Sequence, residues 1–414
     1  MAVMRANAER IARRAAELAR IGGSARSRTG APTPASVTRL GLTREERDAH
    51  ELVASWLRRL GARIRHDQAG NVFGRFGGPG PAVLVGSHLD SVPFGGRYDG
   101  ALGVVVAVEA MEVLRAARVA PRTPIEVVAW ADEEGVRFGI GLYGSLAALG
   151  RLPKGAAART DADGVTIRDA LRALGLRGDP TKARIRADQV RAYIEPHIEQ
   201  GPRLAERRIP LAVVSSIVGI LHSRVTVRGR QDHAGTTPMG RRADTLAGAA
   251  QMIAAVEAAA TRRGAEAVGT VGEIAVRPGA KNVIPGECVF SLDIRAPSDR
   301  TLGAVVRDVE RAILRTSRER GLSASIDVLN GVPVARMDRG LRRALRRACE
   351  AVGVDAPELV SGAGHDAENP AHAGIPTGML FIRSTGGSHN PGESADPRDA
   401  SLAASALAHA LVAI

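Results

Sequence analysis

Short, continuous apolar runs constrain the fold of this chain more than any other feature. Residues 81–86 (PAVLVG) and 125–130 (IEVVAW) have the length and the unbroken hydrophobicity of strands buried in the middle of a sheet. A helical pattern over 45–60 precedes the first run, and a second helical pattern over 103–115 separates the two. Strands that alternate with helices in this way indicate an α/β layer.

The middle of the chain has a different order of elements. The predicted strands are 223–228, 268–276, 288–294 and 324–329, and the predicted helices are 243–263 and 302–319. This order is that of the ferredoxin-like βαββαβ unit. Buried strand character returns at 378–383. We therefore predict an α/β domain with a mixed central sheet, formed by residues 1–211 and 326–414, which is interrupted by an inserted α+β domain at 212–325.

The composition excludes several classes of protein. The net charge is +13, but the 57 basic residues are spread along the chain among acidic ones, and aromatic residues make up only 3%. A nucleic-acid-binding surface needs a concentrated basic stripe, preferably with aromatic side chains for stacking, so we expect no nucleic-acid partner. We also expect no membrane association, because no apolar run reaches the roughly 18 residues that span a bilayer.

The cysteines and the N-terminal residues predict a location in the cytoplasm. Cys288 and Cys349 form neither a CxxC pair nor a disulfide framework, which favours a reducing compartment. The first twenty residues lack the apolar segment of a secretory signal. Ile11, Ala15 and Leu18 instead form a stripe at helical spacing, which predicts a helix there.

Ionisable residues gather where the predicted buried strands end. The segments that pass from apolar residues to His, Asp or Glu are 82–99, 125–135, 193–197 and 381–389. Sites in open α/β sheets form outside the carboxyl ends of the strands, so the four segments can converge. Imidazole and carboxylate ligands without a thiolate suit zinc, manganese, cobalt or nickel. The sequence therefore suggests a metal site.

Local spacing gives two pairs of these residues complementary roles. His88 and Asp90 are two apart, so both side chains project to one side of an extended segment, and the carboxylate can hold the second ring nitrogen of a ligating histidine. The adjacent Glu133 and Glu134 point in different directions, so one can bind metal while the other faces a reacting water. Taken singly, His88 could equally be a core histidine, and the glutamates could be the solvated first turn of a helix.

Six motifs together resemble the M20 metallopeptidase superfamily. They are 86–100 (GSHLDSVPFGGRYDG), 131–138 (ADEEGVRF), 197–202 (HIEQGP), 233–239 (HAGTTPM), 364–367 (GHDA) and 388–391 (SHNP). Their order and spacing resemble the amidohydrolase branch, which contains N-carbamoyl-L-amino-acid hydrolases, β-ureidopropionases and allantoate amidohydrolases. The resemblance extends from about residue 10 to the C-terminus.

The resemblance implies a catalytic domain with two divalent metal ions, zinc or manganese, with cobalt or nickel as further possibilities. Asp99 would bridge the two ions. The remaining ligands would be His88 and His197 on one ion and Glu134 and His389 on the other. The implied catalytic residues are Glu133, the general base that takes a proton from water, and Asp90, the carboxylate that supports His88.

The resemblance further implies that the inserted domain is a lid and dimerisation domain, so a homodimer through 212–325 is expected. The residues implied in substrate binding are His233, Asn282 and Arg295 in this domain, and Gln200 and Gly364 in the catalytic domain. Arg295 suits a substrate carboxylate, and His233 and Asn282 suit an oxyanion. In this family the lid histidine can come from the partner subunit. Without the resemblance, Asn282 could equally be a strand-end turn and Arg295 a surface arginine.

The expected substrate is a small ureido compound. We expect hydrolysis of an N-carbamoyl-L-amino acid to the amino acid, ammonia and carbon dioxide. The alternative is allantoate, which also carries a ureido group beside a carboxylate. A peptidase activity is less expected, because His197 stands where such peptidases usually carry an acidic ligand. Residues 139–144 satisfy GxGxxG, but they lie well beyond the 125–130 strand, so they do not indicate a dinucleotide site.

Overall fold

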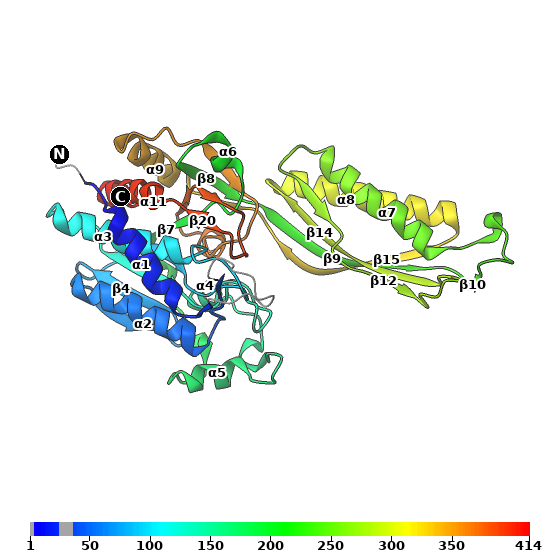
Figure 1. Ribbon diagram of the computed structural model, residues 1–414, viewed down its shortest axis with the longest axis horizontal. Coiled ribbons are helices and arrows are strands. Elements are labelled where there is room, and N and C mark those ends of the chain that lie inside the picture. Colours follow the sequence, from blue (N-terminus) through cyan, green and yellow to red (C-terminus); the bar gives the residue numbers. More distant parts are fainter. Residues whose placement is uncertain (1–3, 25–35) are drawn as a thin grey trace. The chain divides into compact units, whose positions relative to one another are not determined.

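The structure is a computed structural model that describes residues 4–24 and 36–414 (Figure 1). The chain divides into two compact units. The first consists of the chain up to Ser215 with Met337–Leu359 and His365–Ile414, and the second of Ser216–Arg336 and Val360–Gly364. The second unit extends past the predicted limit of 325, because strand β15 (Ser323–Val332) is longer than the predicted strand at 324–329.

The first unit is built on a mixed sheet. Its strands are, in spatial order, β16 (Ala335–Arg336), β8 (Leu211–Ile217), β18 (Thr377–Ile382), β7 (Val190–Ile198), β5 (Ala82–His88), β6 (Ile125–Trp130), β4 (Val72–Phe76) and β3 (Arg63–His66), with β17 (Glu358–Ser361) also paired to β8. Strands β18, β7, β5 and β6 are parallel, whereas β8, β4 and β3 pair antiparallel with their neighbours. The predicted mixed central sheet is confirmed, and the three apolar runs are β5, β6 and β18.

Helices pack on the middle strands in one large hydrophobic core. They are α1 (Ala8–Arg20), α2 (Arg44–Arg59), α3 (Ala101–Ala116), α9 (Arg339–Ala351) and α11 (Pro397–Ala413). The predicted N-terminal helix is therefore α1, and its Ile11 and Leu18 lie in this core. Helix α3 is buried on nearly every side, which explains its run of Val and Ala.

One charged residue of α3 is also buried. Glu109 is fully buried and accepts hydrogen bonds from the guanidinium groups of Arg10 and Arg14, with N–O distances of 2.6–3.0 Å. A buried carboxylate is tolerated only when it is paired in this way. Helix α1 therefore docks on α3 through ion pairs as well as apolar contacts.

Smaller elements complete the first unit. They are α4 (Tyr143–Ala148), α5 (Ile167–Ala173), α6 (Arg203–Arg207), α10 (Glu368–His372), β1 (Gly23–Ser24), β2 (Ser36–Val37), β19 (Ser384–Thr385) and β20 (Ser394–Ala395). Helices α4 and α5 share a second core with Phe138, Ile140 and Ala131. Strands β19 and β20 form a hairpin that carries the 388–391 motif.

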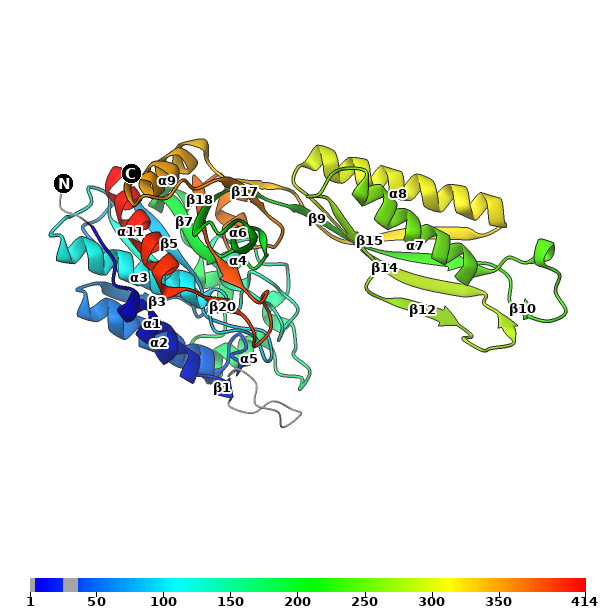
Figure 2. The same cartoon turned by 45° about the horizontal axis from the view of Figure 1, so that its top comes forward.

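The second unit has the predicted ferredoxin-like order. Its elements are β9 (Gly219–Arg228), α7 (Thr245–Thr261), β11 (Val268–Thr270), β12 (Ile274–Arg277), β14 (Glu287–Ala296), α8 (Asp299–Arg320) and β15. The strands are antiparallel in the order β11-β14-β9-β15, with β12 also paired to β14. Both helices lie on the same side of this sheet (Figure 2), where they enclose the core of the unit.

The predicted strand at 268–276 is two strands in the structure. The hydroxyl of Ser291 on β14 accepts hydrogen bonds from the backbone N–H groups of Gly272 and Glu273, at 3.2 and 3.0 Å. They accompany a 3.0 Å hydrogen bond from the backbone N–H of Ser291 to the carbonyl of Glu273, and residues 271–273, between β11 and β12, are not part of a strand. The single apolar pattern gave no sign of this interruption.

Within the described ranges, 4–24 and 36–414, no helix combines the length and the hydrophobicity that crossing a bilayer requires. The longest helix, α8, has 22 residues and carries many charges.

The close contact of α3 with the sheet predicts a strict requirement for glycine at position 103. A Cβ atom at Gly103 would lie 2.0 Å from the carbonyl oxygen of Pro196 on β7, whereas one at Gly303 of α8 would meet only the flexible end of Arg307, at 3.2 Å. We expect Gly103→Ala to lower the free energy of unfolding by roughly 2 kcal/mol or more. Gly303→Ala should be neutral or stabilise by up to ~1 kcal/mol, because alanine favours a helix. Urea unfolding followed by circular dichroism measures both changes, and equal effects would contradict the assignment.

Candidate metal and catalytic site

The predicted metal ligands meet at the carboxyl ends of the parallel strands. His88 is the last residue of β5, His197 is the next to last of β7, and Glu134 follows β6. Asp99 lies just before α3, and His389 lies in the β19–β20 hairpin. Parallel strands bring their carboxyl ends to one edge of a sheet, which explains why segments so distant in sequence converge.

Asp99 lies at the centre of this cluster. Its Oδ1 is 3.4 Å from Nε2 of His197, and its Oδ2 is 3.2 Å from Nε2 of His389. Nε2 of His389 is also 3.2 Å from Oε1 of Glu134. Among the described residues, four groups have potential ligand atoms within 4.8 Å of one another, and two of them consist of predicted ligands alone: His88, Asp99 and His197, and Asp99, Glu134 and His389. The predicted ligands therefore form two sets of three that share one carboxylate.

The histidine tautomers suit metal binding. Nδ1 of His197 is 2.9 Å from the backbone carbonyl oxygen of Ile198, which fixes the proton on that nitrogen. Nε2 of His197 is buried and has no hydrogen-bond partner among the described residues. A buried nitrogen lone pair without a donor is costly unless a cation is bound to it. The donor set therefore fits a metal ion.

Asp90 holds three groups of the site. Its Oδ1 is 3.2 Å from Nδ1 of His88 and accepts a 2.9 Å hydrogen bond from the backbone N–H of Glu133. Its Oδ2 accepts a 3.0 Å hydrogen bond from the backbone N–H of Glu134. The structure thus shows the predicted contact with His88 and adds a second role that we did not predict, because Asp90 also fixes the backbone of both glutamates.

A glycine at the start of α3 leaves room for the His88 ring. Gly100 has φ +60°, and a Cβ atom there would lie 2.4 Å from three atoms of that ring. The position therefore requires glycine for its backbone conformation and for its closeness to the ring.

Burial and mutual repulsion of the acids dominate the electrostatics. Burial raises the pKa of Glu133 well above its usual value and also raises that of Glu134. Burial opposes ionisation of Asp99, but hydrogen bonding with His389 and the nearby His197 lower its pKa overall. Hydrogen bonds to Asp99 and Glu134 raise the pKa of His389 to about 10. So many acidic groups can be ionised together at one buried point only when positive charge lies among them.

Glu133 belongs to neither of these two sets, although its carboxylate also lies within 4.8 Å of potential ligand atoms of His88 and Glu134. Its Oε2 is 3.8 Å from Nε2 of His88, and its side chain is buried. Burial raises the pKa of Glu133, so this carboxylate accepts a proton more readily than an exposed one. This arrangement suits a general base.

The structure places Gln200 on the carboxylate of Asp99. Its Nε2 lies 3.1 and 3.0 Å from the two oxygens of Asp99. Gln200 has φ +63°, an uncommon conformation for a residue other than glycine, which aims its side chain at the site. We predicted a substrate-binding residue there, and in the structure this amide contacts a predicted metal ligand.

His233 and Asn282 lie together at one end of the second unit. The short strands β10 (Asp232–His233) and β13 (Val283–Ile284) pair, and the backbone N–H of Ala234 donates a 3.0 Å hydrogen bond to the carbonyl of Asn282. The His233 side chain is exposed, and its Nδ1 accepts hydrogen bonds from the two backbone N–H groups at 235 and 236. Its Nε2 therefore carries the proton and can serve as a donor.

Arg295 lies in β14 of the five-stranded sheet, at the end of that sheet remote from β10. It pairs with Ile220 near the start of β9, whereas β10 follows the end of β9 at Arg228. Eight residues of extended strand separate Ile220 from Arg228, which is about 27 Å at about 3.4 Å per residue. The structure therefore does not bring Arg295 to His233 within one chain.

The guanidinium of Arg295 already has protein partners. It forms two hydrogen bonds with Asp293, of 3.0 and 2.9 Å, and donates to the carbonyl of Gly362 at 3.2 Å. The segment Val360–Gly364 belongs to the second unit, so Gly364 is grouped there and not with the catalytic unit as we expected. The contact of Arg295 with Gly362 and the hydrogen bond from the N–H of Val218 to the carbonyl of Ser361 explain this grouping.

Sequence analysis missed Glu393. This buried residue accepts hydrogen bonds from the backbone N–H groups of Tyr98 and Asp99, at 2.8 and 3.0 Å. In the sequence, Glu393 is marked only by its position two residues after the 388–391 motif. Its hydrogen bonds are with residues 98 and 99, which are distant in the sequence.

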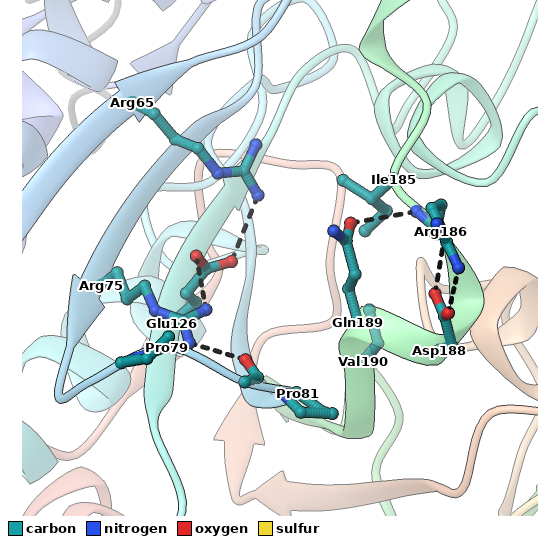
Figure 3. A pocket seen from close by; sticks show the side chains of 11 residues that line it. Arg65, Arg75, Pro79, Pro81, Glu126, Ile185, Arg186, Asp188, Gln189 and Val190 are labelled. Carbon is teal, nitrogen blue, oxygen red and sulfur yellow. Dashed lines mark hydrogen bonds and ion pairs between the residues drawn. The ribbon is translucent and has the colours of Figure 1, made fainter.

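A separate cavity of about 620 Å³ opens where β5 and β7 begin, at the opposite end of these strands (Figure 3). Glu126 lies in its wall between Arg65 and Arg75, at 3.2 and 3.4 Å. None of the predicted site residues lines this cavity. It is therefore distinct from the candidate site.

Comparison with known proteins gives concordant matches. A family model described as Peptidase family M20/M25/M40 matches residues 84–413. The chain is 42% identical over 384 residues to an N-carbamoyl-L-amino acid amidohydrolase of Geobacillus stearothermophilus. This alignment covers 90% of this chain and 92% of that protein. It is 35% identical over 396 residues to a probable allantoate deiminase of Oryza sativa subsp. japonica, with 87% and 80% covered. The structure is similar to that of an amidase of the hydantoinase/carbamoylase family from Burkholderia multivorans, with a TM-score of 0.88, 33% identity and coverage of 99% and 98%.

Burial of His50 behind the site predicts a loss of stability in acid. Nε2 of His50 is 3.3 Å from the carbonyl oxygen of Trp130, and burial lowers the pKa of His50 to about 3. The unfolded chain takes up a proton near pH 6.5 while the folded chain does not, so this group destabilises the fold as the pH falls from about 6.5 towards 3.

Between pH 7 and pH 5 the contribution amounts to about 2 kcal/mol. We expect His50→Gln, which retains a donor for Trp130, to lose that much less stability than the unsubstituted protein over this interval. Urea unfolding at both pH values measures the difference. Parallel losses in the two proteins would show that His50 does not titrate in this way.

Proposed function

The chain belongs to the M20/M25/M40 peptidase family, and we propose that it is a metal-dependent amidohydrolase that cleaves the carbamoyl C–N bond of an N-carbamoyl-L-amino acid. The products would be the amino acid, ammonia and carbon dioxide. The observation that carries this proposal is the 42% identity, along 90% of the chain, to an N-carbamoyl-L-amino acid amidohydrolase. The site supports a hydrolase, because histidines and carboxylates surround a position suited to metal-activated water.

Allantoate is the alternative substrate. The 35% identity to a probable allantoate deiminase favours it, and allantoate also presents a ureido group beside a carboxylate. Peptide hydrolysis is less favoured, because relatives with 35–42% identity are named for carbamoyl or allantoate substrates.

The proposed cofactor is a pair of divalent ions, zinc or manganese, with cobalt or nickel also suited to these ligands. Asp99 would bridge them. His88 and His197 would complete one ligand set, and Glu134 and His389 the other. When bound, two such ions lower the pKa of a shared water and polarise the substrate carbonyl.

Glu133 is the proposed general base. Burial raises its pKa, so it can take the proton of the attacking water and hold it until the leaving nitrogen receives it. Asp90 would keep Glu133 at a constant distance from His88, because the same oxygen of Asp90 contacts His88 and the backbone N–H of Glu133. Proton transfer and ligand geometry would thus depend on one buried carboxylate.

Arg295 is the proposed partner of the substrate carboxylate. A guanidinium binds a carboxylate through two parallel hydrogen bonds, and the Asp293 carboxylate occupies the same donors in this structure. Substrate would therefore replace Asp293 at Arg295. His233 and Asn282 would donate to the oxyanion, and the Gln200 side chain and the Gly364 backbone would contribute further contacts.

We further propose that the active enzyme is a homodimer in which His233 and Asn282 act on the substrate of the partner subunit. The separation of about 27 Å along β9 supports this, because one small substrate cannot touch both ends of the sheet. Val328 and Leu329 are 65% and 56% exposed on the edge strand β15, which supports an interface in this unit. The two buried free cysteines suit a location in the cytoplasm.

The function is tested by ammonia release from purified protein reconstituted with manganese or zinc. The substrates are N-carbamoyl-L-amino acids, N-carbamoyl-β-alanine, allantoate and a dipeptide, each with and without a chelator. Chelator-sensitive release from N-carbamoyl-L-amino acids is the expected result. Release from allantoate alone would favour the alternative. Dipeptide cleavage releases no ammonia and is scored separately as free amine; that cleavage alone would contradict both.

Glu133→Gln should abolish turnover and leave metal binding intact. The amide cannot accept the proton of water, so we expect kcat to fall by at least about 100-fold. Metal content, measured by plasma mass spectrometry, should remain that of the unsubstituted protein. Loss of metal in this variant would make Glu133 a ligand and contradict its assignment as the base.

Sharing of the site between subunits predicts complementation. His233→Ala and Arg295→Ala should each be nearly inactive alone. Mixed dimers would contain one intact site, so co-refolded chains in equal amounts should recover roughly one quarter of the activity. The control is each variant refolded with itself. Absence of recovery in a mixture that forms mixed dimers would show that both residues act within one chain.

A further inference from the structure

Glu393 forms a bridge between the two loops that carry Asp99 and His389. Its carboxyl group is buried, and one oxygen, Oε1, accepts hydrogen bonds from the backbone N–H groups of Tyr98 and Asp99, at 2.8 and 3.0 Å. Glu393 itself belongs to the β19–β20 hairpin, four residues after His389. A single side chain thus ties the hairpin to the loop before α3.

Ser388 extends this bridge to the side chain of Asp99. Its Oγ is 2.7 Å from Oε2 of Glu393 and 2.6 Å from Oδ2 of Asp99. The same Oδ2 is 3.2 Å from Nε2 of His389. The backbone and the carboxylate of Asp99 are therefore both held through Glu393, the first directly and the second through Ser388.

The surrounding backbone reserves space for this carboxyl group. A Cβ atom at Gly96 would lie 2.2 Å from Oε1 of Glu393, so any other residue there would displace it. The hairpin is also fixed internally, because the side chain of Asn390 donates to the carbonyls of Gly386 and Ser388 and accepts from the N–H of Gly392. Because the hairpin is held together internally, the position of Glu393 also determines the position of His389.

We propose that Glu393 is a positioning residue that sets the distance between Asp99 and His389 and thereby forms the second metal position, the one completed by Glu134. This inference rests on the proposed function in one respect, because it requires that the site binds two ions. Outer residues that orient metal ligands typically contribute 10–100-fold to affinity. Asp99 belongs to both ligand sets, but at the first position His88 and His197 are held independently, by Asp90 and by the backbone. Removal of Glu393 should therefore weaken binding of the second ion much more than binding of the first.

The test compares manganese binding to metal-free Glu393→Ala, Glu393→Gln and Ser388→Ala with that of the unsubstituted protein, by calorimetric titration and by metal content after gel filtration. In Glu393→Gln the amide oxygen can accept from both N–H groups and the amide nitrogen can donate to Ser388. We expect two ions per chain in the unsubstituted protein and in Glu393→Gln. Glu393→Ala and Ser388→Ala should retain one ion tightly and bind the second roughly 10–100-fold more weakly.

Asp67 provides the matched control. It is buried, and it likewise accepts two backbone hydrogen bonds with one oxygen, from Ala69 and Asn71, and one side-chain hydrogen bond with the other, from the Asn71 amide. None of its partners is a proposed metal ligand. Asp67→Ala should lower the melting temperature, because buried hydrogen bonds are lost, but the variant should still bind two ions.

The outcomes separate the two proposals. Two tightly bound ions in Glu393→Ala and Ser388→Ala would overturn the role of Glu393 and leave the proposed function intact. Loss of the second ion in Asp67→Ala as well would also overturn it, because the effect would then follow from destabilisation alone. Failure of the unsubstituted protein to bind two ions would contradict the metal proposal itself. If Glu393→Ala does not fold, Ser388→Ala alone decides, since it removes only the link to Asp99.

Discussion

Repulsion among buried carboxylates is the interaction on which the rest of this structure depends. Asp90, Asp99 and Glu133 are at most 9% exposed and lie at one edge of the sheet with Glu134 beside them. Desolvation raises the pKa of both glutamates, so the fold holds these acids against their preference for water. Histidines supply part of the missing positive charge, and the buried Nε2 of His197 accepts no hydrogen bond from the residues that the structure describes. Bound cations would resolve both conflicts at once, which is why the site is best understood as a metal centre.

The scaffold contributes rigidity and close approach. Parallel strands β5, β6 and β7 deliver their carboxyl ends to a common edge, and α3 lies against them with glycines at Gly100 and Gly103 where a side chain would strike His88 or Pro196. Asp90 links the end of β5 to the segment after β6, because it contacts His88 and accepts hydrogen bonds from the backbone of that segment. These contacts hold the predicted ligands in place, as catalysis at a metal centre requires.

In the second unit, the distance between Arg295 and His233 could not be predicted from the order of its elements. Arg295 and His233 were both predicted to contact substrate, yet Arg295 pairs with the start of β9, whereas His233 lies in β10, beyond the end of β9. A strand is a stiff spacer with a fixed rise per residue, so this separation follows directly from the strand pairing. Both roles can hold only if two chains contribute to each site, which links the proposed activity to assembly.

The sequence alone determined the features that depend on neighbours along the chain. Apolar runs and helical stripes predicted β5, β6, β18 and α1, and the ends of those runs predicted which acids and histidines converge, because strand ends in a parallel sheet meet at one edge. Contacts between distant segments were decided by the tertiary structure alone. Glu393 bonds to residues 98 and 99, which lie 295 and 294 positions away. The division of the predicted strand 268–276 and the separation of Arg295 from His233 likewise depend on which strands pair. A local pattern records the burial of a residue, but a hydrogen bond also requires the position of its partner, and only the folded chain sets that position.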